Sequence, residues 1–231
     1  MLPKWENLDE SLQCEAVKKY YDILSKKKGS LFIKRLFDIV VSLIMIILLS
    51  PILIFISIWI KIDSPGTVFY RQVRVTKNNK DFRIFKFRTM VSNADKIGSL
   101  VTIGQDNRIT KVGNKLRKVR LDELPQLFNI LKGDMSFVGT RPEVRKYVDE
   151  YNDEMKATLL MPAGVTSLAS IKFKDEDEII SKHVEEGYSV DEAYINFALS
   201  KKMEYNLEAL KEFSFIKEIG LMFKTVFEVL K

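Results

Sequence analysis

The segment Lys115–Val144 holds the densest group of side chains that could act on a phosphate. It reads KLRKVRLDELPQLFNILKGDMSFVGTRPEV and places the adjacent carboxylates Asp122 and Glu123 directly after three cations, Arg117, Lys118 and Arg120. Nearby positive charges favour the ionised form of a carboxyl group. We therefore expect both carboxylates to be held ionised, and an ionised carboxylate can ligate Mg²⁺ or attack phosphorus.

The acidic pair also has a purely structural interpretation. Asp122 would cap the start of a helix, and Glu123 would interact with that helix's positive N-terminal end. Such a pair is common at helix starts, and capping does not exclude catalysis. Arg141, which precedes the rigid Pro142, adds one more cation to the same segment.

The charge of the chain is unevenly distributed, although the net charge is only +6. Residues 66–120 contain fourteen Lys and Arg against three Asp and Glu, whereas residues 142–231 contain twelve against eighteen. A positive electrostatic field concentrated in this way favours ligand phosphates, anionic lipid headgroups or nucleic acid as partners. The alternative interpretation is a basic surface that contacts only solvent. Cys14 is the only cysteine, so no intrachain disulfide can form, and a cytosol-facing protein fits best.

An apolar run from Ile39 to Ile60 must be the membrane-associated part of the chain. Its only other residues are Ser42, Ser50, Pro51 and Ser57. A helix of this length would extend about 33 Å, which is enough to cross a bilayer, so a single spanning helix is the default.

Two features of this run favour a re-entrant hairpin over a spanning helix. Pro51 removes a backbone donor in the middle of the run, and Ser50 can satisfy the backbone groups that a bend frees. Basic residues also flank both ends, and the positive-inside rule then assigns both ends to the same side of the membrane. They are Lys26, Lys27, Lys28, Lys34 and Arg35 before the run and Lys61, Arg71, Arg74, Lys77 and Lys80 after it.

The rest of the chain predicts an α+β fold that is mostly helical. Residues 67–70 and 81–88 alternate with period two around a polar turn at 77–80, which indicates a β-hairpin with a basic face. Helices are expected at 92–98, 114–121, 122–131 and 213–230, the last an amphipathic helix that could lie on the membrane or on the core. The expected organisation is an N-terminal amphipathic extension (1–30), a re-entrant membrane helix (31–62) and a catalytic domain with interfacial helices (63–231).

Four motifs in order resemble a known family, the monotopic phosphoglycosyl transferases, also called bacterial sugar transferases of the polyprenyl-phosphate type. The motifs are KRLFDIV, SP, RIFKFRTM and RLDELPQLFNILKGDMSFVGTRPE, and the resemblance covers roughly residues 31–165. It implies that a sugar 1-phosphate passes from a nucleoside diphosphate sugar to polyprenyl phosphate, with release of a nucleoside monophosphate.

The resemblance also implies roles for individual residues. Asp122 would be the nucleophile, forming an acyl phosphosugar intermediate, and would contact Mg²⁺. Glu123 would assist by proton transfer or by organising the metal. Lys86, Arg88, Arg117 and Arg141 with Pro142 match basic positions of the family pattern, so they are expected to bind the diphosphate, which suits the hydrogen-bond fork of Arg.

The sequence departs from the family pattern at places that concern sugar recognition. Thr76 stands where the family often has Gly, residues 161–170 replace a common Arg-Pro-Gly loop, and an acidic run follows at Asp175–Glu178. These differences leave the acidic pair intact but leave the sugar undetermined.

The expected partners are a nucleoside diphosphate sugar, polyprenyl phosphate and membrane lipids at the cytoplasmic face of the bacterial inner membrane. Nucleic acid is not expected, because no recognition motif supports it and the aromatic residues of 81–88 fit a strand's buried face. A non-catalytic, membrane-tethered nucleotide-sugar-binding scaffold is the alternative function, but it predicts a lost nucleophile. The sequence leaves open whether copies of the chain associate.

Overall fold

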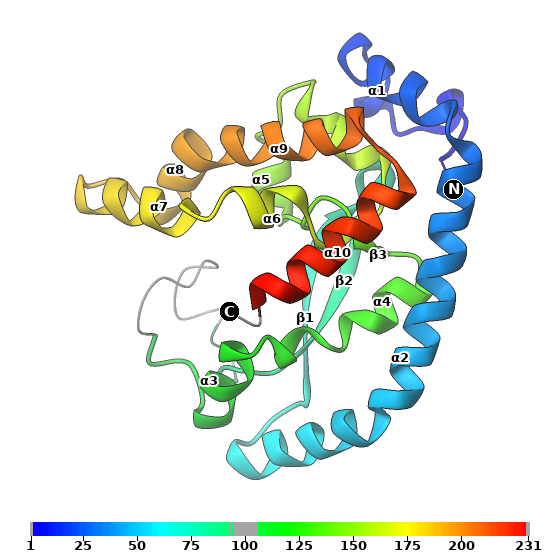
Figure 1. The fold of residues 1–231 in the computed structure, drawn as a ribbon. Helices are drawn as coiled ribbons and strands as arrows, with labels where there is room; N and C mark the ends of the chain where they lie inside the picture. The colour runs from blue at the N-terminus through cyan, green and yellow to red at the C-terminus, as the bar shows by residue number, and fades with distance from the viewer. Residues whose placement is uncertain (1, 93, 95–105, 230–231) are drawn as a thin grey trace.

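One long helix curves along the edge of the molecule, and the rest of the protein packs against its inner side (Figure 1). The computed structural model describes residues 2–92, 94 and 106–229. It has short strands among many helices, which confirms the expected α+β, mostly helical class. The predicted helix at 92–98 falls largely outside the described residues.

The N-terminal segment folds onto the body of the protein. It comprises two 3-10 turns, η1 (Trp5–Asn7) and η2 (Glu10–Leu12), and the helix α1 (Glu15–Ser25). Leu12, Val17 and Leu24 are buried in the main core, and the Tyr20 hydroxyl donates to Glu154 Oε1 at 2.6 Å. The apolar face of this amphipathic segment therefore completes the main core.

The helix α2 (Lys28–Asp63) contains the apolar run and continues through Pro51. It changes direction in its second half (Figure 1), as expected where a proline removes a backbone hydrogen bond. The Ser50 hydroxyl donates to the carbonyl oxygen of Ile47 at 2.8 Å, so it satisfies one acceptor beside the proline. α2 is long and apolar enough to cross a membrane by length and composition.

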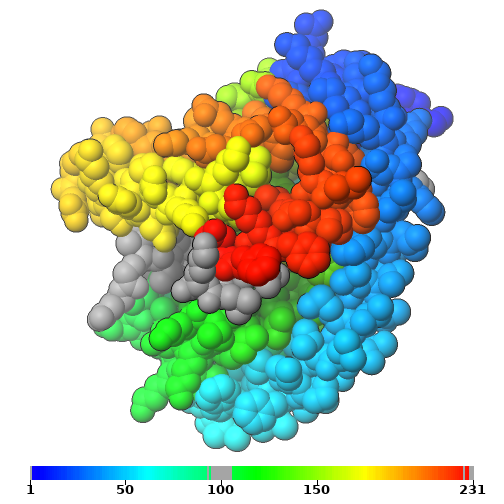
Figure 2. Space-filling view, viewed as in Figure 1, coloured from blue at the N-terminus to red at the C-terminus, as the bar shows by residue number. Residues whose placement is uncertain are grey.

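Both arms of α2 pack against the same protein body. The first arm places Met45, Ile46 and Leu49 against the helix α4 (Gln126–Lys132), and the second buries Ile56 and Ile60 against the helix α3 (Lys111–Lys118). The opposite side of α2 is apolar and exposed, and it forms one continuous edge of the molecule in Figure 2. This exposed row includes Phe32, Leu36, Leu43, Ile47, Leu48, Ile54, Phe55, Ile58 and Ile62.

Polar side chains of the KRLFD motif fix the first arm of α2 to this body. The Arg35 guanidinium donates to the carbonyl oxygens of Ile130 and Leu131, at the C-terminal end of α4, where a cation also favours the helix dipole. Asp38 is buried, and its Oδ1 accepts from the Ser136 hydroxyl at 3.1 Å and from the Phe137 amide at 3.2 Å. The motif therefore anchors α2 to the folded domain.

The predicted β-hairpin is present. Strands β1 (Phe69–Thr76) and β2 (Lys80–Phe87) pair antiparallel with Phe69 opposite Phe87, and the turn η3 (Lys77–Asn79) joins them. Asn78 and Asn79 have positive φ values of 56° and 54°, a conformation that Asn tolerates better than most residues. The first strand is longer than the sequence pattern indicated.

A second, two-stranded sheet was not predicted. Strand β3 (Met135–Val138) pairs parallel with β4 (Ala163–Thr166), and between them lie the helix α5 (Arg145–Val148) and the 3-10 helix η6 (Met155–Leu160). A parallel pair needs a crossover of this length. The backbones approach closely at Gly139 and Gly164, because a Cβ on Gly164 would lie 2.4 Å from the Gly139 carbonyl oxygen.

The C-terminal part of the chain, yellow to red in Figure 1, forms a helical layer that contacts η6, α1, α2 and β3. The helix α10 contacts α2, β3 and α6 on one side but leaves Ile216, Phe223 and Phe227 exposed on the other. It therefore packs on the core and still presents an apolar face. The elements of this layer are α6 (Leu168–Lys172), α7 (Glu176–Glu185), α8 (Val190–Ala193), the π-helical segment η7 (Tyr194–Leu199), α9 (Ser200–Lys211) and α10 (Phe215–Val229).

Candidate active site

The acidic pair lies on a short turn between two helices. The helix α3 ends at Lys118, Arg120 adopts the left-handed conformation with φ 57°, and the 3-10 turn η5 (Leu121–Glu123) follows. A left-handed conformation is uncommon for a residue other than glycine, and such residues cluster at functional sites. Pro125 then precedes α4.

Asp122 does not cap a helix. Arg120 occupies the N-cap position of η5 and Pro125 that of α4, and neither position has a side-chain capping hydrogen bond. The expected helix from 122 to 131 is therefore wrong in its first turn. Its N-terminal part is a 3-10 turn that ends at a proline, because proline cannot donate to a preceding carbonyl.

A basic cavity of about 880 Å³ opens beside this turn. Asp122, Glu123 and four of the predicted phosphate-binding residues line it. Among its described lining residues, eight are Lys or Arg and two are acidic, so the cavity carries the positive field that the sequence concentrates in residues 66–120. The eight are Arg74, Lys86, Arg88, Arg108, Arg117, Lys118, Arg120 and Arg141.

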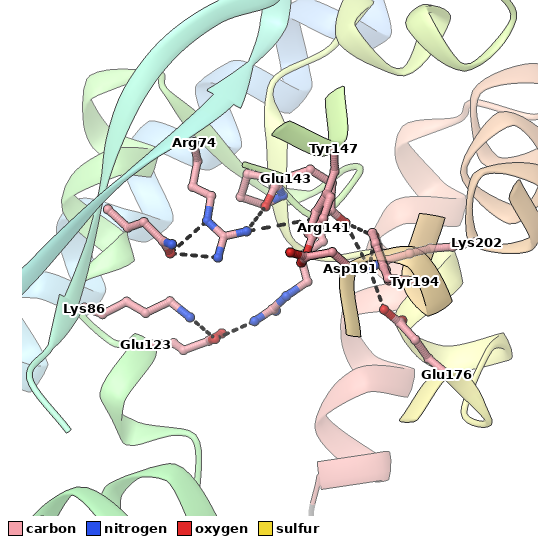
Figure 3. A network of polar contacts seen from close by, with 12 residues as sticks. Arg74, Lys86, Glu123, Arg141, Glu143, Tyr147, Glu176, Asp191, Tyr194 and Lys202 are labelled. Carbon is pink, nitrogen blue, oxygen red and sulfur yellow. Dashed lines mark hydrogen bonds and ion pairs between the residues drawn. The ribbon is translucent and has the colours of Figure 1, made fainter. Parts of the chain in front are cut away.

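Glu123 is held between two of these cations (Figure 3). Its Oε1 accepts from Lys86 Nζ at 2.8 Å and from an Arg141 guanidinium nitrogen at 2.6 Å. Burial raises the pKa of the Glu123 carboxyl, but Arg141 and Lys86 outweigh it and hold the pKa well below its usual range. The expectation that Glu123 is held ionised agrees with this geometry.

Asp122 behaves differently from its neighbour. Burial and the negative charge of Glu123 raise the pKa of the Asp122 carboxyl, although Lys86 and Arg117 oppose the shift. Its Oδ1 is buried and receives no hydrogen bond from any described residue. The ionised state expected for Asp122 stays a prediction, and its pKa is raised rather than lowered because Lys86 and Arg141 direct their donors to Glu123.

Arg117 reaches the cavity because α3 packs directly on the end of β2. The Thr110 amide donates to the Thr89 carbonyl oxygen at 2.9 Å, and Arg117 Nε donates to the Thr89 hydroxyl at 2.9 Å. A Cβ on Gly113 would lie only 2.0 Å from the Thr89 carbonyl oxygen. Glycine is therefore required at position 113 for this close approach.

Arg88 connects the cavity to the end of the membrane helix. Its guanidinium donates to the Ser64 carbonyl at 2.6 Å, to the Ser64 hydroxyl at 2.9 Å and to the Pro65 carbonyl at 2.9 Å. Its buried Nε has no hydrogen-bond partner within the described part of the chain. Diphosphate binding by Arg88 stays a prediction, and in this structure the residue also ties the loop after α2 to β2.

The remaining predicted residue lies next to the wall of the cavity, and two residues of β1 that were not predicted lie in it. Pro142 does not line it, but its carbonyl oxygen accepts from Arg74 at 3.1 Å. Arg74 and Gln72 belong to the site although the sequence assigned them no role, and Gln72 Oε1 accepts from the Arg74 guanidinium at 2.8 Å. The two-residue period of β1, which also brings Tyr70 into the wall, is the signal that could have identified them.

The described residues contain no group of three or more His, Cys, Asp or Glu side chains that could form a complete metal cage. Mg²⁺ is commonly held by only one or two carboxylates together with substrate phosphates and water. Asp122 lines a basic cavity suited to a diphosphate, and its Oδ1 has no hydrogen-bond partner among the described residues, so it fits a metal site of that kind.

The sequence as a whole matches a known family. A family model described as bacterial sugar transferase matches residues 29–231, which is most of the chain. This chain belongs to the bacterial sugar transferase family. The resemblance inferred from the four motifs is thereby confirmed.

This bacterial sugar transferase is similar to curated enzymes that differ in their sugar. It is 38% identical over 202 residues to the UDP-N-acetylgalactosamine-undecaprenyl-phosphate N-acetylgalactosaminephosphotransferase of Aeromonas hydrophila, covering 86% of this chain and 44% of that relative. It is 35% identical over 201 residues to the UDP-glucose:undecaprenyl-phosphate glucose-1-phosphate transferase of Escherichia coli, covering 85% and 40%. It is 37% identical over 166 residues to the undecaprenyl-phosphate galactose phosphotransferase of Salmonella typhimurium, covering 65% and 34%. The chain thus spans less than half the length of these relatives.

Replacing Glu123 by Gln should lower the free energy of unfolding by about 1–3 kcal/mol, because Lys86 and Arg141 would then face each other without a countercharge. Chemical denaturation in detergent micelles measures this change. Glu212→Gln is the control, since Glu212 pairs with Lys217 at 2.7 Å on the exposed surface, and it should change the midpoint little. Equal effects of the two variants would contradict the importance assigned to the Glu123 ion pairs.

Proposed function

We propose that this chain is a phosphoglycosyl transferase. It would move a sugar 1-phosphate from a nucleoside diphosphate sugar, a UDP-sugar, to undecaprenyl phosphate, the first membrane step in building a glycoconjugate such as an exopolysaccharide. The observation that carries the proposal is the basic cavity in which the Asp122 Oδ1 is buried without a hydrogen bond beside the paired Glu123. The activities for which these relatives are named support the same reaction.

Asp122 would be the nucleophile in a two-step reaction. In the first step, a carboxylate oxygen attacks the β-phosphorus, the bond from that phosphorus to the bridging oxygen breaks, and a nucleoside monophosphate leaves. In the second step, a phosphate oxygen of the lipid attacks the same phosphorus and the bond to Asp122 breaks. The product is a polyprenyl diphosphate sugar, and the carboxylate is regenerated. The position of Asp122 in the lining of the basic cavity, beside the cations that would bind the diphosphate, supports this role.

Glu123 would organise charge in this reaction. Its low pKa and its two ion pairs favour this role over proton transfer. Lys86 and Arg141, which Glu123 holds, would face the diphosphate together with Arg117. Two like charges 4 Å apart repel by about 4 kcal/mol at an effective dielectric constant of 20, so an anionic nucleophile and two anionic substrates need such cations. Mg²⁺ bound at Asp122 would supply further neutralisation of the diphosphate.

The helix α2 would enter the cytoplasmic leaflet, bend near Pro51 and return. Both arms pack on the same folded body, at α4 and at α3, so a spanning arrangement would place part of that body inside the membrane. The exposed apolar row of α2 would face lipid. Arg88, which joins the end of this helix to the cavity wall, supports a catalytic site close to the headgroups.

Replacing Asp122 by Asn should abolish release of nucleoside monophosphate while the protein stays folded, because the amide is a poor nucleophile. The assay incubates the purified chain in lipid with undecaprenyl phosphate and a panel of UDP-sugars, which also identifies the sugar. Asp153→Asn, at an exposed side chain paired with Lys156, is the matched control and should retain full activity. Normal turnover by the Asp122 variant would rule out the nucleophile assignment.

Removing divalent cations should stop the transfer, and adding excess Mg²⁺ should restore it. The reason is that a single protein carboxylate and a diphosphate leave much uncompensated negative charge at the reacting phosphorus. Activity is measured after treatment with a chelator and again after titration with MgCl₂, with CaCl₂ as a comparison. Undiminished transfer in the chelator would remove the metal from the proposed reaction.

Single cysteines at the two ends of α2 should be protected together from a membrane-impermeant maleimide applied to intact cells. Lys28→Cys and Lys61→Cys, both at exposed positions, are made in a Cys14→Ser background. Lys182→Cys in α7 reports the side on which the folded body lies. If the re-entrant arrangement is correct, all three sites behave alike and react only after the cells are opened. Labelling of one end alone in intact cells would demonstrate a spanning helix.

A further inference from the structure

A buried charged network lies behind the cavity and is centred on Glu143 (Figure 3). Its Oε1 accepts from the Tyr194 hydroxyl at 2.6 Å and pairs with Lys202 Nζ at 3.0 Å. Its other oxygen, Oε2, lies 4.0 Å from the Arg74 guanidinium. The network therefore joins the cavity wall, where Arg74 lies, to the C-terminal helical layer.

Lys202 is the cation at the centre of this network. It lies on α9, is 8% exposed, and does not line the cavity. Its Nζ contacts Glu143 Oε1 at 3.0 Å, Glu176 Oε1 at 2.9 Å and the Tyr194 hydroxyl at 3.2 Å. Glu176 belongs to the acidic run at 175–178 that departs from the family pattern. At least one carboxylate of that run therefore serves as a countercharge to Lys202.

The π-helical segment η7 brings Tyr194 and Lys202 to the same carboxylate. In a regular α-helix, two side chains eight positions apart differ in direction by about 80°, so Tyr194 and Lys202 would point to different sides. A π-helix has wider turns, with hydrogen bonds from residue i to i+5, and its residues advance by a smaller angle. η7 covers residues 194–199 and reduces the offset, so both side chains reach Glu143.

The network holds three consecutive residues of the loop that carries Arg141. The Arg141 guanidinium reaches forward to Glu123 at 2.6 Å. The Pro142 carbonyl accepts from Arg74 at 3.1 Å, and the Glu143 carboxylate is held by Lys202 and Tyr194. Without Lys202, Glu143 would be a buried carboxylate whose nearest remaining cation is Arg74, with Arg141 two residues away on the same loop.

We propose that Lys202 is a positioning residue for donor binding: by neutralising Glu143, it keeps Arg74 and Arg141 directed into the cavity. A buried carboxylate that loses its cation draws other cations toward itself, since an uncompensated buried charge is costly. Arg74 and Arg141 would then turn toward Glu143 and away from the diphosphate. This inference rests on the proposed function, because it takes the donor to be a nucleoside diphosphate sugar.

The test compares Lys202→Met with the double variant Glu143→Gln/Lys202→Met in the full chain reconstituted in lipid. For Lys202→Met, we expect the donor KM to rise about tenfold or more and kcat to change less, because donor-binding side chains are displaced. UDP binding measured by calorimetry should weaken in parallel. In the double variant the buried charge of Glu143, which lies beside Arg74, is removed, so the donor KM should return to within about threefold of the wild type. Lys201→Met, the exposed neighbour on the same helix, is the matched control and should leave KM unchanged.

A donor KM close to wild type in folded Lys202→Met would overturn the inference. If Lys202 had only a structural role, its replacement would lower the unfolding midpoint and leave the donor KM unchanged. A double variant as impaired as the single one would also overturn it. If Lys202→Met does not fold, the double variant decides: a donor KM within threefold of wild type supports the inference, and a tenfold rise contradicts it. Failure of the wild type to transfer any sugar phosphate would instead contradict the proposed function.

Discussion

The arrangement of the cavity depends on the partly buried ion pairs of Glu123 with Lys86 and Arg141. Lys86 comes from the hairpin, Glu123 from the turn between α3 and α4, and Arg141 from the loop after β3. One carboxylate therefore joins three segments that are distant in the sequence. Removing one partner of a buried ion pair is much more costly than removing a surface pair, so the three segments are held in one relative arrangement.

The same ion pairs give two adjacent carboxyl groups pKa shifts in opposite directions. Glu123 takes both cations and is held ionised, whereas Asp122 is left buried with a raised pKa and an unbonded oxygen. Active sites often contain two carboxyl groups whose environments push their pKa values apart, with a different task for each. In the proposed reaction, Glu123 supports the binding groups and Asp122 attacks phosphorus.

The long apolar helix α2 and the cavity are joined by hydrogen bonds at both ends of the helix. The KRLFD motif fixes the first arm of α2 to α4 and β3, and Arg88 fixes the loop after the second arm to the end of β2. The depth at which α2 enters the bilayer would therefore set the height of Asp122 relative to the lipid headgroups. This coupling suits an enzyme whose acceptor carries its phosphate at the interface.

The sequence by itself determined the local elements and singled out the acidic pair as the candidate reactive group. The hairpin follows from its period-two pattern, the membrane helix from its apolar run with Pro51 at the bend, and the cluster around Asp122 and Glu123 from its composition and motifs. These features depend on residues close together in the chain, and local patterns report them directly.

Tertiary structure alone decided the features that depend on distant contacts. The parallel pair β3–β4 joins strands of only four residues across a long crossover, which gives little periodic signal. The N-terminal segment completes the core through contacts with residues more than a hundred positions away in the sequence, which no local pattern reports. Lys202 meets Glu143 only where η7 turns the side chains of Tyr194 and Lys202 to the same side. Most clearly, the direction of the Asp122 pKa shift could not be predicted, since nearby cations in the sequence indicate a lowered pKa, but only the folded structure directs the donors of Lys86 and Arg141 to Glu123.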